Sequence, residues 1–406
     1  DSRKKGQFIR GRILAASYVN FANDNAYDVQ RMRYTLTMNT RQPTDRGFGA
    51  ETYISFRHTI NEWQDVKDNF KQAMKIYSLA VGYQFAPGTQ VWLGRKINTS
   101  ISNLGAIDGV QLEKRWHTLT TGFFFGSRPD YEDYGFNFHL LQVGTYLAHD
   151  LETRNGQVLS TLAFAEQQNN HHTDRRYIYI QHSNSAIKNI NLFGSAEIDL
   201  YTLSNLQPKD TFNLTSIYFS IRYRVSRALS LFASYDARKN IIYYESYKNF
   251  IDQLLEDETR QGLRFSFNYH LLKKVTLGSS AGLRFERNNP KPSQNVYSYV
   301  TVSRITPLHL SATASAVLLR TSYLKGNIFG LRLSRDFFKG KLNTEAEYRN
   351  VVYRYGSTEY PIRQSIVGLN ASIRINRKLS IAINYEGEIQ STMTLHRIYS
   401  SIVNRF

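Results

Sequence analysis

The sequence predicts an all-β fold, a transmembrane antiparallel β-barrel of about 22 strands within a range of roughly 18 to 24. Three observations support this prediction. Apolar and polar residues alternate along stretches that are longer than ordinary soluble strands. Short connections alternate with mostly longer ones, as in a barrel with short periplasmic turns and longer extracellular loops. β-forming residues are frequent along most of the chain, whereas proline occurs only 8 times in 406 residues.

The first strands can be placed from the turns that bound them. A strand from Gln7 to Asn20 precedes a polar loop at 23–25, and a second strand runs from Asp28 to Arg41. A turn at 42–47 leads to a third strand from Phe48 to Ile60. No long helical period separates these stretches, which excludes a βαβ architecture.

Connection lengths alternate along the rest of the chain. Short links are expected at 86–88, 225–227, 272–274, 306–308, 339–341 and 376–378. Mostly longer links are expected at 61–72, 167–174, 203–210, 239–259 and 287–294. A soluble β-sandwich has less reason to segregate its connections in this way, so the pattern favours a barrel.

The alternation is clearest from Ala228 onward and weakest between Gly109 and Asp150. A membrane strand needs about 9 to 11 residues, and apolar side chains at every second position would face lipid. The opposite face would line the lumen. Its charged members are predicted to be Arg264, Arg284, Arg332, Arg374, Glu345, Glu347 and Glu386.

Composition narrows the classes of function. The chain has no cysteine, which excludes disulfides, thiolate metal sites and a cysteine nucleophile. Its net charge of +18 comes from residues spread along the chain, so a nucleic-acid partner is not expected. No apolar run reaches the roughly 18 residues of a transmembrane helix. We expect residues 7–406 to form one barrel, after a periplasmic stub at 1–6 that could be the end of an upstream domain.

The last stretch, Thr394 to Phe406, reads as a final strand that ends on an aromatic residue. It resembles the C-terminal strand of Gram-negative outer-membrane β-barrel proteins, although Ser400 and Asn404 depart from the apolar pattern of that strand. The resemblance implies that Phe406 is an assembly signal for the barrel-assembly machinery. It also implies an integral outer-membrane protein in contact with the lipid bilayer and lipopolysaccharide.

A glycine-rich stretch from Gly94 to Asn137 interrupts the strand pattern. Its motifs at 94–98, 104–109 and 126–131 resemble a segment of uncharacterised porin-like barrels of Bacteroidetes-type bacteria, a resemblance that carries no known activity. A loop here could fold into the lumen as an ion-paired constriction, or it could be an ordinary surface loop. The candidate constriction residues are Arg95, Asn98, Asp108, Arg115, Arg128 and Asp130.

Signals for catalysis are poor, and no catalytic residue, cofactor or metal site is predicted. The stretch Gly278–Gly282 matches a nucleophile-elbow pattern, but it lies within an alternating strand instead of a strand-to-helix turn. The pair His171–His172 falls in a polar loop and is expected to be solvated. Helical spacing at 63–70 and at 250–255 predicts short helices packed over the barrel mouth, or else a docking surface for a partner.

Two functions remain open on the sequence alone. The first is a passive diffusion channel, which could favour anions unless the inward arginines are neutralised by the inward glutamates. The alternative is a non-conducting structural or scaffolding subunit of a larger outer-membrane complex for protein secretion, insertion or surface-lipoprotein assembly. Its partners would be other outer-membrane proteins or surface lipoproteins. The width of the barrel motivates this alternative, because so wide a lumen needs a plug. An outer-membrane hydrolase is a distant third.

Overall fold

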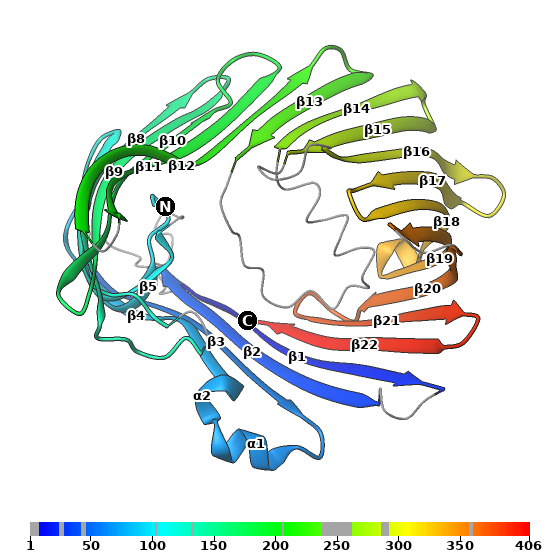
Figure 1. Ribbon diagram of the computed structural model, residues 1–406, viewed down its shortest axis with the longest axis horizontal. Helices are drawn as coiled ribbons and strands as arrows, with labels where there is room; N and C mark the ends of the chain where they lie inside the picture. The colour runs from blue at the N-terminus through cyan, green and yellow to red at the C-terminus, as the bar shows by residue number, and fades with distance from the viewer. Residues whose placement is uncertain are drawn as a thin grey trace, which may run out of the picture.

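The strands of the chain form one closed cylinder. The computed structural model describes residues 8–23, 28–41, 46–101, 104–130, 133–204, 207–237, 262–285, 292–356 and 360–406. Its single sheet has 22 strands, in which each strand pairs antiparallel with the next along the chain (Figure 1). The last strand, β22 (Thr394–Arg405), pairs antiparallel with the first, β1 (Phe8–Ala22). The predicted fold class, an antiparallel β-barrel of about 22 strands, is therefore confirmed.

The remaining strands follow in chain order around the cylinder. They are β2 Val29–Arg41, β3 Gly47–Thr59, β4 Met74–Ala86, β5 Thr89–Ile97, β6 Ala106–Trp116, β7 Leu119–Ser127, β8 Leu140–Thr153, β9 Gly156–Asn169, β10 His172–Asn184, β11 Ile190–Ser204, β12 Gln207–Arg224, β13 Leu229–Asp236, β14 Gly262–Leu272, β15 Val275–Arg284, β16 Ser293–Ile305, β17 Leu310–Arg320, β18 Leu324–Phe337, β19 Leu342–Tyr355, β20 Ile362–Arg374 and β21 Leu379–Gln390.

The two ends of the chain meet at the closure of the barrel. The backbone N–H groups of Gly11 and Phe406 each donate to the carbonyl of the other residue, at 3.0 Å. The Phe406 ring lies against Gly11, where a Cβ atom would approach it within 2.3 Å. Glycine at this position therefore makes room for the terminal aromatic ring that the sequence singled out.

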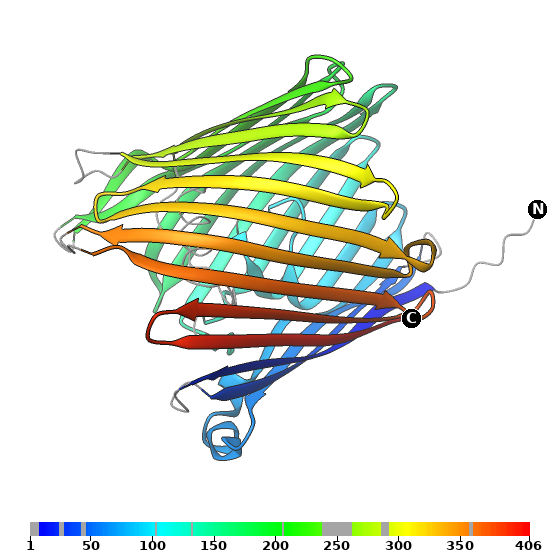
Figure 2. The same cartoon turned by 90° about the vertical axis from the view of Figure 1, so that its right-hand side faces the viewer.

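The outer surface is apolar because every second side chain of a strand faces away from the lumen. Leu331, Leu333, Ile373 and Ile375 are examples of large apolar residues that remain exposed on this surface. The strands are tilted relative to the axis of the cylinder (Figure 2). Closure of the sheet pairs the backbone N–H and C=O groups, which lipid could not do. A closed sheet with an apolar outer surface suits a bilayer. Among the described residues, no helix is long and apolar enough to span a membrane.

A charge placed on the outer face is expected to destabilise the barrel in lipid. Leu331 lies near the middle of β18 and is 49% exposed. Leu331→Arg should lower the free energy of unfolding by about 2–4 kcal/mol, because an arginine near the bilayer midplane loses its hydration. Urea titration of the barrel in lipid vesicles would measure the change. Ser334→Arg, on the opposite face of the same strand, should cost much less, and equal costs would contradict the assignment of the two faces.

Short connections gather at the end of the cylinder where the chain starts and finishes, as predicted. Those within the described residues span 87–88, 117–118, 154–155, 185–189, 225–228, 273–274, 306–309, 338–341 and 375–378. The opposite end is less regular than expected. The predicted long loop at 167–174 is wrong, since β9 and β10 leave only 170–171 between them. The predicted long loop at 203–210 is also wrong, since β11 reaches Ser204 and β12 begins at Gln207. The predicted loops at 239–259 and 287–294 lie wholly or mostly outside the described residues, as does the predicted stub at 1–6.

The first predicted helical segment is present, but not over the barrel mouth. Helices α1 (Trp63–Asp68) and α2 (Phe70–Ala73) lie on the outer side of the ring of strands (Figure 1). The ring of Phe56, on β3, lies 6.3 Å from that of Trp63 and 6.4 Å from that of Phe70. These aromatic contacts hold the helices against the outer face, so the prediction of a cover over the mouth is wrong. The second segment, 250–255, lies outside the described residues.

Candidate functional site

The inner wall of the barrel carries charged side chains opposite the apolar outer positions. Arg332 lies between the outward-facing Leu331 and Leu333, so its side chain belongs to the lumen side of β18. The same alternation places the other predicted lumen residues on the inner side, namely Arg264, Arg284, Arg374, Glu345, Glu347 and Glu386. The lumen is therefore lined by fixed charges of both signs.

Several inner arginines are neutralised by carboxylates on neighbouring strands. Arg332 lies 3.5 Å from Glu345 and 3.3 Å from Glu347. Glu386 pairs with Arg349 at 3.0 Å and with Arg397 at 2.7 Å. These ion pairs neutralise charges on the inner wall between β18 and β22. The sequence left open that inward glutamates neutralise the inward arginines, and for Arg332 they do.

A second group of paired charges lies on the opposite part of the wall. The guanidinium of Arg175 contacts Glu197 at 2.7 Å and Asp199 at 2.8 Å, and it stacks over the ring of Tyr177 at 4.2 Å. All of these groups come from β10 and β11. Arg175 with its two carboxylates has a net charge of −1, so this group braces the wall without adding positive charge to the lumen.

The segment between β5 and β6 folds against the inner wall. Ile101 is 0% exposed, and Leu104 is also buried. Both belong to an apolar cluster with inward-facing residues of β7–β10, which are Phe124, Tyr146, Ala148, Ala163, Ala165, Tyr177 and Tyr179. The described residues after β5, up to Ile101 and again from Leu104, therefore lie on the lumen side of β7–β10.

Polar contacts fix the start of this infolded segment. The side-chain amide of Asn98 donates to Gln111 and to the hydroxyl of Tyr146, both at 3.2 Å. The Tyr146 hydroxyl in turn donates to the carboxylate of Glu113. Gln111 also donates to the backbone carbonyl of Lys96 at 3.0 Å. This buried network leaves the segment little freedom to move away from the wall.

Arg95 and Asp108 do not belong to a lumen loop, which corrects that part of the prediction. They lie within β5 and β6, directly opposite each other in the strand register. Two hydrogen bonds of 2.5 Å join the guanidinium to the carboxylate, and both side chains are buried. Arg95 is on the side of β5 that carries the outward-facing Leu93 and Ile97. The pair is therefore part of the wall.

The buried Arg95 provides hydrogen bonds to backbone carbonyl groups where the pairing of β4 with β5 ends. Pairing between β4 and β5 stops at Leu79 and Arg95, although β4 begins at Met74. The Arg95 guanidinium donates to the carbonyl of Ile76 at 2.6 Å and to the carbonyl of Tyr134. The arginine thus satisfies carbonyl groups beyond the point where the strand ladder ends.

The other candidates in the glycine-rich stretch occupy separate places. Arg115 lies near the short turn at 117–118, at the opposite end of β6 from Asp108, and its contact with Asp150 spans 3.9 Å. Arg128 follows β7 at the other end and donates to Gln167 at 3.4 Å. Asp130 accepts from the backbone N–H of Tyr134 through its own backbone carbonyl, at 3.1 Å. The structure thus does not bring all six candidates into one constriction.

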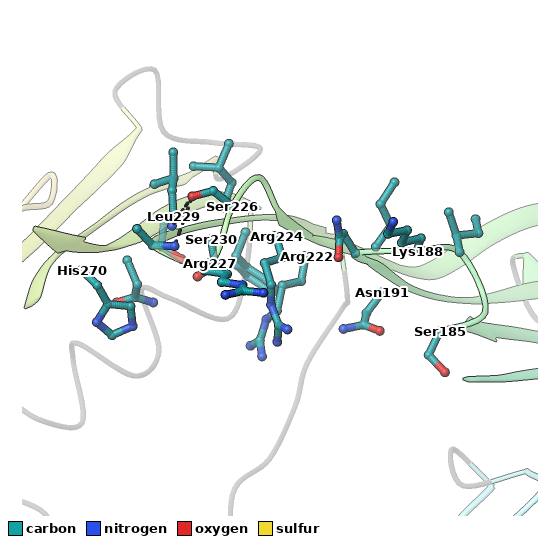
Figure 3. Close-up of a pocket in the computed structure, with 18 of the residues that line it drawn as sticks. Ser185, Lys188, Asn191, Arg222, Arg224, Ser226, Arg227, Leu229, Ser230 and His270 are labelled. Carbon is teal, nitrogen blue, oxygen red and sulfur yellow. Dashed lines mark hydrogen bonds between the residues drawn. The ribbon is translucent and has the colours of Figure 1, made fainter. Parts of the chain in front are cut away.

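A pocket of about 930 Å³ on the inner wall was missed by the sequence reasoning. It lies at the short-turn end, between the 185–189 turn and β14. Figure 3 shows the side chains of Arg222, Arg224 and Arg227 pointing into the same space, with His270 on the same side. Leu229 points to the other side of the sheet (Figure 3). Arg222 and Arg224 alternate with the exposed Tyr223, and this alternation could have indicated from the sequence that the two arginines face the lumen.

The weak catalytic motifs do not assemble into a recognisable site. Gly278–Gly282 lies inside β15, so it lacks the strand-to-helix turn of a nucleophile elbow. His171 is in the tight link between β9 and β10, and His172 starts β10. Within the described ranges, no group of three or more histidine, aspartate or glutamate side chains could hold a metal ion.

Neither a protein-family model nor a curated protein matches the chain.

Solved structures with a similar backbone do exist. Pseudomonas aeruginosa OccK3 (OpdO) matches with a TM-score of 0.49 at 10% identity, over 98% of this chain and 96% of that one. Acinetobacter baumannii OccAB2 matches with a TM-score of 0.48 at 10% identity, over 99% and 100%. P. aeruginosa OccK2 (OpdF), in complex with glucuronate, matches with a TM-score of 0.43 at 8% identity, over 98% of both chains.

Proposed function

We propose that this chain is an integral outer-membrane protein of a Gram-negative bacterium, a passive diffusion channel that favours small anions. The main support is the contrast between the two faces of the barrel. The outer face is apolar and suits lipid, whereas the inner face is polar and carries arginines such as Arg222, Arg224 and Arg264. Fixed cations along a water-filled path raise the local concentration of anions.

The orientation follows from the connections. The short turns, the start of β1 and the end of β22 share one rim, which faces the periplasm in this proposal. Phe406 then lies at the periplasmic rim, where barrel-assembly machinery would recognise it, and lipopolysaccharide would surround the opposite rim. The resemblance of the glycine-rich stretch to Bacteroidetes-type barrels remains a prediction of the sequence.

The infolded segment supplies the narrowing of the channel. Asn98 and Ile101 bind it to the inner wall of β6–β10, on the side opposite the paired charges of β18–β22. Arg128 reaches the same wall through Gln167 and adds a positive charge near the loop rim. In this arrangement Asn98 and Arg128 belong to the constriction, whereas Arg95 and Asp108 support it from within the wall.

Liposome swelling tests the proposed channel. Purified barrel in liposomes should admit gluconate faster than N-methylglucamine, which has a similar size and the opposite charge, with neutral sorbitol in between. Raising the ionic strength should reduce the difference, because salt screens the lumen charges over about 8 to 10 Å near 0.1–0.15 M. Equal rates for the two ions, or a faster rate for the cation, would contradict the anion preference.

A scaffolding role is a second candidate, favoured by the outward helices. Trp63 and Phe70 are about half exposed on α1 and α2, outside the ring of strands. Such aromatic residues either rest at the membrane interface or meet a partner protein. Extraction in a mild detergent discriminates the two roles, since a scaffold would co-purify in fixed stoichiometry with other outer-membrane proteins or lipoproteins. A barrel that migrates alone on native gels would count against the scaffold.

A further inference from the structure

The basic pocket on the inner wall concentrates positive charge from several strands and turns. Arg222 and Arg224 come from β12, Arg227 from the turn after it, Lys188 from the 185–189 turn, and Arg264 from β14. None of the described residues that line the pocket is acidic. Five cations thus line one pocket, of which four lie at or near the short-turn rim and Arg264 lies farther along its strand, in register with Ser234.

These cations differ from the arginines elsewhere on the inner wall. Arg175, Arg332 and Arg397 each lie within 3.5 Å of carboxylates on their own or neighbouring strands. In the described part of the chain, no ion pair involves Arg222 or Arg224. Uncompensated guanidinium groups repel one another, which costs stability in the empty barrel. An anionic ligand would remove that cost.

The rest of the pocket suits an organic anion with polar substituents. Phe232 faces the pocket from β13, and the guanidinium of Arg222 lies 5.9 Å from the centre of its ring. Ser230 and Asn268 lie beside Phe232 on the same inner face and offer neutral hydrogen-bonding groups. A ligand could therefore place its carbon skeleton near the ring and its hydroxyls near the serine and asparagine, while its acidic groups meet the arginines.

The cations also flank β13 on both sides. The strand register places Arg224 beside Ser230, and Ser230 beside Asn268, so two strand spacings of about 4.8 Å separate β12 from β14. Arg264 lies across β13 from β12 but farther from the short-turn rim than Arg222, because it is in register with Ser234, which is in register with Ser220. One acidic group could bind at the β12 side and a second at the β14 side. The volume of about 930 Å³ is enough for a metabolite of this kind.

We propose that this pocket is a binding site for hydroxylated organic anions that carry two or more phosphate or carboxylate groups. The inference deepens the proposed function and rests on it for the path by which a solute reaches the pocket. The site would hold such a solute at the periplasmic end of the lumen, where guanidinium groups bind phosphate or carboxylate oxygens through paired hydrogen bonds.

Calorimetric titration of the detergent-solubilised barrel with fructose 1,6-bisphosphate tests the site. The wild-type protein should bind this probe, and binding should weaken steeply as salt is added. Fructose, which lacks the phosphates, should give no heat of binding. Arg224→Gln should weaken binding by about tenfold or more, because it removes one charge-assisted contact. Heat-modifiable migration on gels would show that each variant is folded.

Arg374→Gln is the matched control for Arg224→Gln. Both arginines are the last residues of strands that end at the short-turn rim, and both lie on the inner face, but only Arg224 lines the pocket. The control should change the affinity by less than about twofold. Equal losses in the two variants, or no binding by the wild-type protein at millimolar probe, would overturn the proposed site.

The results also separate the site from the channel. If planar bilayers with folded barrel carry no current but the titration distinguishes Arg224 from Arg374, the binding site is supported and the channel is refuted. If the current is selective for anions but the two variants bind the probe equally, the channel is supported and the site is refuted.

Discussion

Replacing Ile101 by aspartate is expected to raise the single-channel conductance severalfold. Ile101 is 0% exposed within the apolar cluster that binds the infolded segment to the wall. A carboxylate buried there without a partner costs several kcal/mol, and the substitution also removes the apolar contacts of Ile101. The segment should therefore leave the wall and widen the lumen. Current steps in planar bilayers would measure the change.

Ile101→Val provides the control for this substitution. It keeps the site apolar and should cost only about 0.5–1.5 kcal/mol, so the segment should stay in place and the conductance should be unchanged. If Ile101→Asp folds normally and conducts like the wild-type protein, the infolded segment does not limit the channel.

Replacing Asp108 by alanine is expected to lower the free energy of unfolding by about 3–5 kcal/mol. The substitution leaves the buried guanidinium of Arg95 without its carboxylate, and only the carbonyl groups of Ile76 and Tyr134 remain as acceptors. Urea titration of the barrel in lipid, followed by tryptophan fluorescence, would measure the loss. The anion preference should change little, because the pair faces away from the lumen.

Two variants control for the effect of Asp108→Ala. Glu345→Ala removes a carboxylate from Arg332, whose side chain is 47% exposed, and should cost no more than about 1 kcal/mol. Replacing both wall residues, with Arg95→Met and Asp108→Leu, should regain much of the stability, because no unpaired charge remains. If Asp108→Ala costs no more than Glu345→Ala, the pair does not brace the wall.

The strands from β13 onward could be predicted from the sequence because their two faces meet different media. Lipid requires apolar residues such as Leu263 and Phe265 on one side, and the lumen tolerates residues such as Arg264 on the other. The alternation that results is visible without a structure. Together with the alternating lengths of the connections, this contrast was enough to predict the number of strands and the rim of short turns.

The glycine-rich stretch was misjudged because its inner face is apolar too. Phe124 faces inward and packs against the infolded segment, while Phe123 and Phe125 face outward. Three consecutive phenylalanines erase the period of two on which the prediction depended. The partnership of Arg95 with Asp108 depends on the register of β5 with β6, which spacing along the chain does not reveal.

The basic pocket shows a related limit. The sequence could have indicated Arg222 and Arg224 as lumen residues, since each adjoins the outward-facing Tyr223. Lys188 and Arg264 lie near these arginines only because of strand pairing. Lys188 precedes β11, which pairs with β12, and Arg264 is on β14, which is separated from β12 by β13. A cluster of this kind is a property of the closed sheet, and its members are far apart along the chain.

Single-channel current across a planar bilayer tests the central claim most directly. The purified chain would be added under a salt gradient, after gel mobility has shown that the barrel is folded. We expect discrete current steps and a reversal potential that indicates anion preference, reduced when the salt concentration is raised on both sides. A folded barrel that gives no current, or one that prefers cations, would contradict the account.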